Sequence, residues 1–100
     1  MSELVPGIEA EHYAALRTFL RGYLHQDVVP EHGSPVAAAR AFRKDADERE
    51  ASIVHAQLER LLEETSRLPD SELARVLERL GSSWNFRSRS EVEQLRDAFK

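Results

Sequence analysis

The chain has 100 residues, of which 41% are hydrophobic and 32% are charged, and its formal net charge is −4 at pH 7. This length suits one domain with a single core. No segment approaches the roughly 20 apolar residues that cross a bilayer, so we expect a soluble cytoplasmic protein with no membrane partner. The sequence has no cysteine, which excludes disulfides and thiolate metal sites, and its acidic balance argues against direct binding of nucleic acid through a basic surface.

The first predicted helix follows an N-terminal segment without hydrophobic periodicity. Residues 1–8 contain a proline–glycine pair, so we expect a flexible terminus there and a single domain over residues 9–100. A helix is predicted over about residues 9–24, because four apolar residues recur at helical spacing. They are Leu16, Phe19, Leu20 and Tyr23. Gly22 interrupts this pattern, and it either lets a neighbour approach closely or marks the beginning of the helix end.

A connection and a short second helix come next. Val29 is pushed out of the α region because it precedes Pro30. Ser34 is then typical of an N-cap, and Pro35 suits the first helical position. The second helix is predicted to run to Asp45, and it turns inward either Val36, Ala39 and Phe42 or Ala38 and Phe42.

The third predicted helix is the longest and extends to about Arg67. Asp45 and Glu48 have capping-box spacing at its start, although aspartate replaces the usual serine or threonine. Its inner stripe consists of Ala51, Val54, Leu58, Leu61, Leu62 and Thr65.

Two further helices complete the predicted fold. Asp70 or Ser71 caps a fourth helix, and Gly81 lies where a C′ glycine is expected after that helix. Ser90 and Glu93 form an S-x-x-E capping box that opens the last helix. The inward residues of these two helices are Leu73, Val76, Leu77, Leu80, Val92, Leu95 and Phe99. No β-strand pattern occurs, so the sequence predicts an all-α, single compact domain of about five helices.

The segment "GYLHQDVVPEHGSP" gathers residue types that enzymes and metal sites use. His25, Asp27 and His32 could ligate a metal, but their spacing is not one of the strong zinc patterns. A hydrolytic triad with Ser34 is disfavoured, because that hydroxyl has a capping role and no G-x-S-x-G motif exists. We instead expect His25 and Asp27 to bond to backbone groups at helix ends, so that replacing either with alanine lowers thermal stability. The sequence therefore predicts neither an enzyme nor a cofactor.

Partner binding is the remaining class of function. We expect Trp84 and Phe86 to fold back over the core, the alternative being that Trp84 is an exposed anchor for a partner. Carboxylates at helix starts have a simple explanation in the helix dipole, but the others could form an electronegative patch that meets a basic partner. A small helical regulator that binds nucleic acid or protein is an alternative, although the long loop before the last helix does not fit a helix-turn-helix.

The segment "LRTFLRGYLHQDVVPEHGSPVAAARAF" resembles the opening of the contact-dependent growth inhibition immunity proteins of the CdiI type. The matching positions are Leu16, Phe19, Gly22, Tyr23, His25, Gln26, Asp27, Gly33, Ser34, Pro35 and Phe42. The later part of the chain is similar to the family's second half, with a capped helix, a glycine, a short aromatic loop and a closing helix. Leu24, Val28 and His32 stand where the family usually has aromatic residues.

The resemblance implies a bacterial cytosolic immunity protein that binds a toxin domain stoichiometrically and blocks it. The toxins of such systems are commonly nucleases, which are often basic, so an acidic inhibitor would associate with them quickly. We expect the free protein to be a monomer. The candidate toxin-binding residues are Glu63, Glu64, Asp70 and Glu72, together with Asp27, Glu31 and Trp84.

Overall fold

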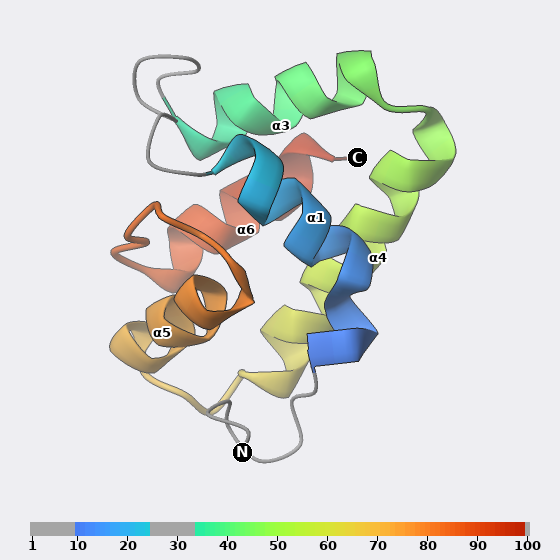
Figure 1. The fold of residues 1–100 in the computed structure, drawn as a ribbon. Coiled ribbons are helices and arrows are strands. Elements are labelled where there is room, and N and C mark those ends of the chain that lie inside the picture. Colours follow the sequence, from blue (N-terminus) through green and yellow to red (C-terminus); the bar gives the residue numbers. More distant parts are fainter. Residues whose placement is uncertain (1–9, 25–33, 100) are drawn as a thin grey trace.

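A computed structural model describes residues 10–24 and 34–99. Over these two stretches it has five α-helices, a short 3-10 helix and no strand, which confirms the all-α domain (Figure 1). The elements in chain order are η1 (Ala10–Tyr13), α1 (Ala14–Tyr23), α3 (Pro35–Asp45), α4 (Glu48–Glu64), α5 (Asp70–Leu80) and α6 (Arg89–Ala98). No helix in this part of the chain is both long and apolar enough to span a membrane. The flexible segment predicted for residues 1–8 lies outside the described residues.

One hydrophobic core joins all five α-helices. Helix α4 packs against both α1 and α6, and α3 lies against α6 on the far side from α5 (Figure 1). Phe19 of α1 is at the centre of an aromatic cluster, with its ring centroid 5.4 Å from that of Phe42 and 5.0 Å from that of Phe99, both in edge-to-face geometry. The cluster therefore ties α1, α3 and the end of α6 together.

The predicted inner faces are confirmed. Every residue of the predicted α4, α5 and α6 stripes is buried, Thr65 included. In α1, Leu16, Phe19 and Leu20 are fully buried and Tyr23 is half-buried. In α3 the buried residues come from both predicted faces, since Ala38, Ala39 and Phe42 are buried together with Pro35, whereas Val36 is half-buried.

The predicted N-cap of α3 is correct, and the predicted N-cap of α4 is wrong. The Ser34 hydroxyl accepts a hydrogen bond from the Ala37 amide at 3.2 Å, which confirms this cap. The cap of α4 is Asp47, whose carboxylate accepts the Glu50 amide at 2.8 Å, rather than Asp45. Asp45 is instead the last residue of α3, and its carboxylate accepts a hydrogen bond from the Tyr23 hydroxyl at 2.8 Å.

The caps predicted for the last two helices are both wrong. Helix α6 starts after Ser88, whose hydroxyl accepts the Glu91 amide, so the S-x-x-E box lies two residues before the predicted one. The Glu91 carboxylate also reaches back across the helix start, where it accepts the amide of Arg87, the residue before the N-cap, at 2.5 Å. At the start of α5, Pro69 occupies the N-cap position and no side chain caps the helix, so neither Asp70 nor Ser71 has that role.

The predicted helix ends are correct for α5 and too long for α4. Gly81 has φ +128°, and a Cβ there would come within 2.7 Å of Arg21 Cγ, so this position requires glycine. Helix α4 ends at Glu64 rather than near Arg67, because Thr65 is its C-cap. Among residues 10–24 and 34–99, no neighbour comes within 4 Å of a Cβ at Gly22, so none of these residues makes the close approach that one interpretation of this glycine expects. α1 ends at the next residue, as the alternative interpretation expects.

Candidate partner-binding surface

Although Ser34 is described, most residues of the segment "GYLHQDVVPEHGSP" that carry a predicted role lie outside the described residues. This applies to His25, Gln26, Asp27, Glu31, His32 and Gly33. Their predicted structural and toxin-binding roles therefore stay predictions, and the metal-binding and hydrolytic alternatives for His25, Asp27 and His32 stay untested. Among residues 10–24 and 34–99, no three histidine, aspartate or glutamate side chains gather closely enough to hold a metal ion.

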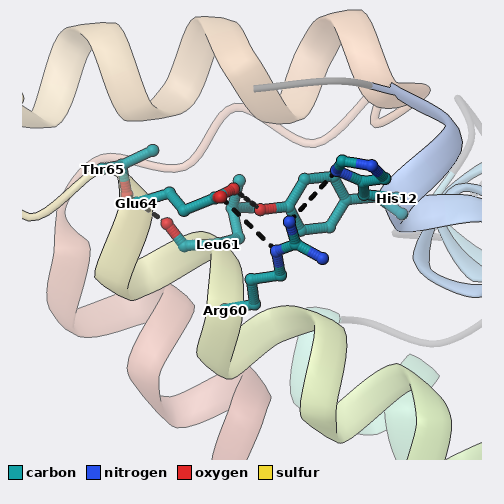
Figure 2. Close-up of polar contacts among 6 residues, drawn as sticks. His12, Arg60, Leu61, Glu64 and Thr65 are labelled. Carbon is teal, nitrogen blue, oxygen red and sulfur yellow. Dashed lines mark hydrogen bonds and ion pairs between the residues drawn. The ribbon is translucent and has the colours of Figure 1, made fainter. Parts of the chain in front are cut away.

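Glu64, predicted to meet a partner, is bound within the fold. Its carboxylate accepts a hydrogen bond from the Tyr13 hydroxyl and another from Arg60 Nε at 3.4 Å (Figure 2). Burial of Tyr13 and, after it, this hydrogen bond raise the pKa of the phenol well above its ordinary value. Arg60 also places its Nη2 atom 3.1 Å from His12 Nδ1. Glu64 therefore fastens η1 to the last turn of α4.

Asp70 is also used within the fold, through Arg89. The Asp70 carboxylate accepts the Arg89 amide at 3.2 Å. The Arg89 guanidinium in turn donates hydrogen bonds to the carbonyls of Leu62, Thr65 and Leu68. These carbonyls lie at and just after the C-terminal end of α4, where backbone acceptors lack helical partners and a cation is favourable. Arg89 therefore caps α4 from another helix.

Sequence reasoning missed Arg89, although one signal was present. The residue occupies the first position of α6, where the positive end of the helix dipole disfavours a cation. An arginine at such a position indicates that its charge is used elsewhere, here at the negative end of α4.

Glu63, one of the predicted partner-binding residues, faces an open groove. It is exposed, and it lines a hollow of about 310 Å³ between α4 and α6. The lining residues, which we call the acidic groove, are Glu59, Leu62, Glu63, Ser66, Arg89, Glu93 and Arg96. Both arginines have internal partners, since Arg89 binds α4 carbonyls and Arg96 pairs with Asp97 at 3.1 Å. The lining therefore holds three carboxylates and two guanidinium groups, so the groove carries a net charge of about −1.

Glu72 and Trp84 are half-buried on other elements. Glu72 is in the first turn of α5. Trp84 packs against the core beside the buried Phe86, as expected of a lid, and its amide and carbonyl both bond to the Ser82 hydroxyl. The Trp84 indole nitrogen is buried, and no described residue forms a hydrogen bond with it. The tryptophan is thus part of the fold, and its contact with a partner stays a prediction.

A second groove, which sequence reasoning did not identify, lies between α3 and the start of α4. It has a volume of about 590 Å³, and the residues that line it, called the basic groove below, are Arg40, Arg43, Lys44, Glu48, Ala51, Ser52 and Phe99. Arg43 donates to the Ala98 carbonyl at 3.2 Å. The sequence does contain a signal, because three cations recur at i, i+3 and i+4 on one face of α3.

Comparison with known proteins gives one match. A family model described as CdiI immunity protein matches residues 12–95, a range that includes all of α1, α3, α4 and α5 and most of α6. No curated protein and no solved structure matches the chain.

Proposed function

The chain belongs to the CdiI immunity protein family, and we propose that it protects its cell by binding one cognate toxin domain and covering the active site of that toxin. The observation that carries this proposal is the family match over residues 12–95. In this mechanism the protein acts by occlusion and supplies no catalytic group of its own. The complex forms in the bacterial cytoplasm, and its stoichiometry is one to one.

The charge of the protein supports a basic toxin, such as a nuclease whose substrate is a polyanion. The net charge is −4, and the acidic groove adds a local concentration of carboxylate at Glu59, Glu63 and Glu93. Complementary charge raises the rate of encounter between two proteins and orients them before contact. Of the predicted acidic residues, Glu63 supports this role best, because Glu64 and Asp70 already hold other parts of the fold.

The proposal is tested by co-expression with the toxin domain encoded beside the gene of this protein. We expect the toxin alone to stop growth and the pair to restore it, and we expect the two purified proteins to form a complex in size-exclusion chromatography. A matched control is a toxin domain from an unrelated system, which this protein should not neutralise. Growth arrest that persists despite stable expression of both proteins would contradict the proposal.

A further inference from the structure

The basic groove is chemically unlike the rest of this acidic protein. Three of its seven lining side chains are cationic and one is anionic, so it carries a local charge of about +2 within a chain of net charge −4. Arg40 and Lys44 are exposed, and within residues 10–24 and 34–99 neither has a hydrogen-bond or ion-pair partner. These two charges are therefore available to an external anion.

The floor of the basic groove is partly apolar. Ala51 and Phe99 are both buried core residues whose edges reach the groove. A volume of about 590 Å³ is within the range of roughly 300–1,000 Å³ in which proteins bind small ligands and single side chains of partners. A groove with cationic walls and an apolar floor fits a peptide segment that has carboxylates beside an apolar side chain.

The two grooves lie end to end along one edge of α4. Glu48 and Ser52 line the basic groove, and Glu59 and Glu63 line the acidic one. These residues follow one another at intervals of four, seven and four, so they share one face of the helix. With a rise of 1.5 Å per residue, about 22 Å of helix separates Glu48 from Glu63. A single partner with a standard interface of about 800 Å² per side is large enough to cover both.

We propose that the basic groove binds an acidic segment of the toxin, which contacts the basic groove and the acidic groove together. This inference rests on the proposed function and adds to it the chemistry of a second contact. The opposite charges of the two grooves then fix the orientation of the toxin, because a partner docked in the reverse sense would place like charges against one another.

A protein segment suits the basic groove better than a nucleic acid does. A polyanion would be attracted by two or three cations but repelled by the net negative charge of the molecule, and nucleic-acid affinity depends on neutralising many phosphates. The apolar floor offers nothing to a phosphate backbone, whereas it can bury a methyl group or a ring of a peptide.

The experiment compares two double variants of equal charge. Arg40→Glu with Lys44→Glu reverses the free cations of the basic groove, and Arg43 is left in place because it bonds to Ala98. Arg67→Glu with Arg75→Glu changes the net charge equally at exposed positions that line neither groove. Binding to the immobilised toxin domain is measured by surface plasmon resonance, and circular dichroism checks that each variant is folded. We expect the groove variant to raise the Kd roughly 10- to 100-fold through faster dissociation, and the control variant to raise it less than about threefold.

Other outcomes would overturn the inference. If both variants weaken binding equally, net charge alone is responsible, and if neither does, the basic groove lies outside the interface. If the wild-type protein does not bind the toxin at all, the proposed function itself fails. A 20-nucleotide DNA that binds wild-type protein but not the groove variant would assign the groove to nucleic acid, and wild-type dimers that the variant abolishes in sedimentation would assign it to a second copy. Should the glutamate variant not fold, Arg40→Gln with Lys44→Gln tests the same contact.

Discussion

The two ends of α4 use charged residues in opposite ways. At the C-terminal end, the Arg89 guanidinium bonds to three carbonyls, and the Glu64 carboxylate bonds to Tyr13 and Arg60. At the N-terminal end, the described cap is a single bond from the Glu50 amide to Asp47, and the cations of the neighbouring basic groove include Arg40 and Lys44, which lack partners within the described residues.

The difference shows why exposure and charge type alone do not identify a binding surface. Glu64 and Asp70 look like candidates for binding a partner because they are acidic and lie on surface helices. The carboxylates of both, however, form internal hydrogen bonds that position η1 and α6. The charges that serve no internal contact mark the surface that remains for a partner. On this criterion the C-terminal end of α4 is mainly structural, and the basic groove and Glu63 are the better binding candidates.

Of the substitutions that test the difference between the two ends of α4, we expect Arg89→Ala to lower the free energy of unfolding most. The substitution leaves several carbonyls at the end of α4 without their donor, and hydrogen bonds to a charged group contribute about 1.5–3 kcal/mol each to stability. Because Arg89 is only half-buried and water can replace some of these bonds, we expect the free energy of unfolding to fall by about 3 kcal/mol in urea denaturation.

Two variants control for the loss of a positive charge. Arg75→Ala removes an exposed arginine of α5 and should change the free energy of unfolding by less than about 0.5 kcal/mol. Arg89→Lys retains the charge but not the planar fork of donors, so it should recover only part of the loss. Equal stabilities for Arg89→Ala and Arg75→Ala would show that the guanidinium does not fix the end of α4.

Tyr13→Phe should have the next largest effect. It removes the hydroxyl that donates to Glu64 and keeps the buried ring, so the change isolates one hydrogen bond. We expect the free energy of unfolding to fall by about 1–2 kcal/mol. The matched control is Tyr23→Phe, which removes a more exposed bond to Asp45 and should cost less. A larger loss for the Tyr23 variant would reverse the assigned importance of the two pairs.

The raised pKa of Tyr13 predicts how the free energy of unfolding changes at alkaline pH. Burial and the Glu64 hydrogen bond raise the pKa of Tyr13 in the folded state above the ordinary value of 10.0. The folded protein then retains a proton that the unfolded chain releases, so this contribution is complete below pH 10 and is lost as the pH rises further. The free energy of unfolding of the wild-type protein should therefore decline above pH 10, and that of Tyr13→Phe should decline less steeply. Parallel curves for the two proteins would show that Tyr13 titrates alike in both states.

The buried faces of the helices could be predicted from the sequence, because apolar residues at helical spacing report directly on which side is inward. The helix starts were harder, since neighbouring polar residues offer overlapping capping patterns. Ser88 with Glu91 and Ser90 with Glu93 have the same spacing, and in the structure Ser88 is the residue that caps α6. Asp45 was likewise a plausible cap until the Tyr23 hydroxyl gave it another role.

The grooves could not be predicted in full, because each includes residues near the C-terminal end of the chain that lie far in sequence from the rest of its lining. Glu93 of α6 joins Glu59 and Glu63 of α4, and Phe99 supplies part of the floor under the α3 cations. Periodicity says which face of a helix is exposed, but it does not say which two helices lie side by side. For the same reason the sequence could not show the contact of Glu64 with Tyr13 or that of Asp70 with Arg89, although the Arg60–Glu64 pair has the i,i+4 spacing of a helical ion pair.

The smallest expected effect separates the binding and structural carboxylates most sharply. Glu63→Lys reverses an exposed charge of the acidic groove that has no described partner, so we expect toxin association to slow by about threefold at low salt while stability stays unchanged. The matched variant Glu64→Lys breaks the contacts with Tyr13 and Arg60, so it should lower the melting temperature. Stopped-flow association at two salt concentrations, with thermal unfolding of both variants, measures the two effects. The slowing by Glu63→Lys should disappear at high salt, because screening removes attraction between exposed charges. A Glu63 variant that destabilises the fold, or a slowing that salt does not affect, would mean that Glu63 also belongs to the structural end of α4.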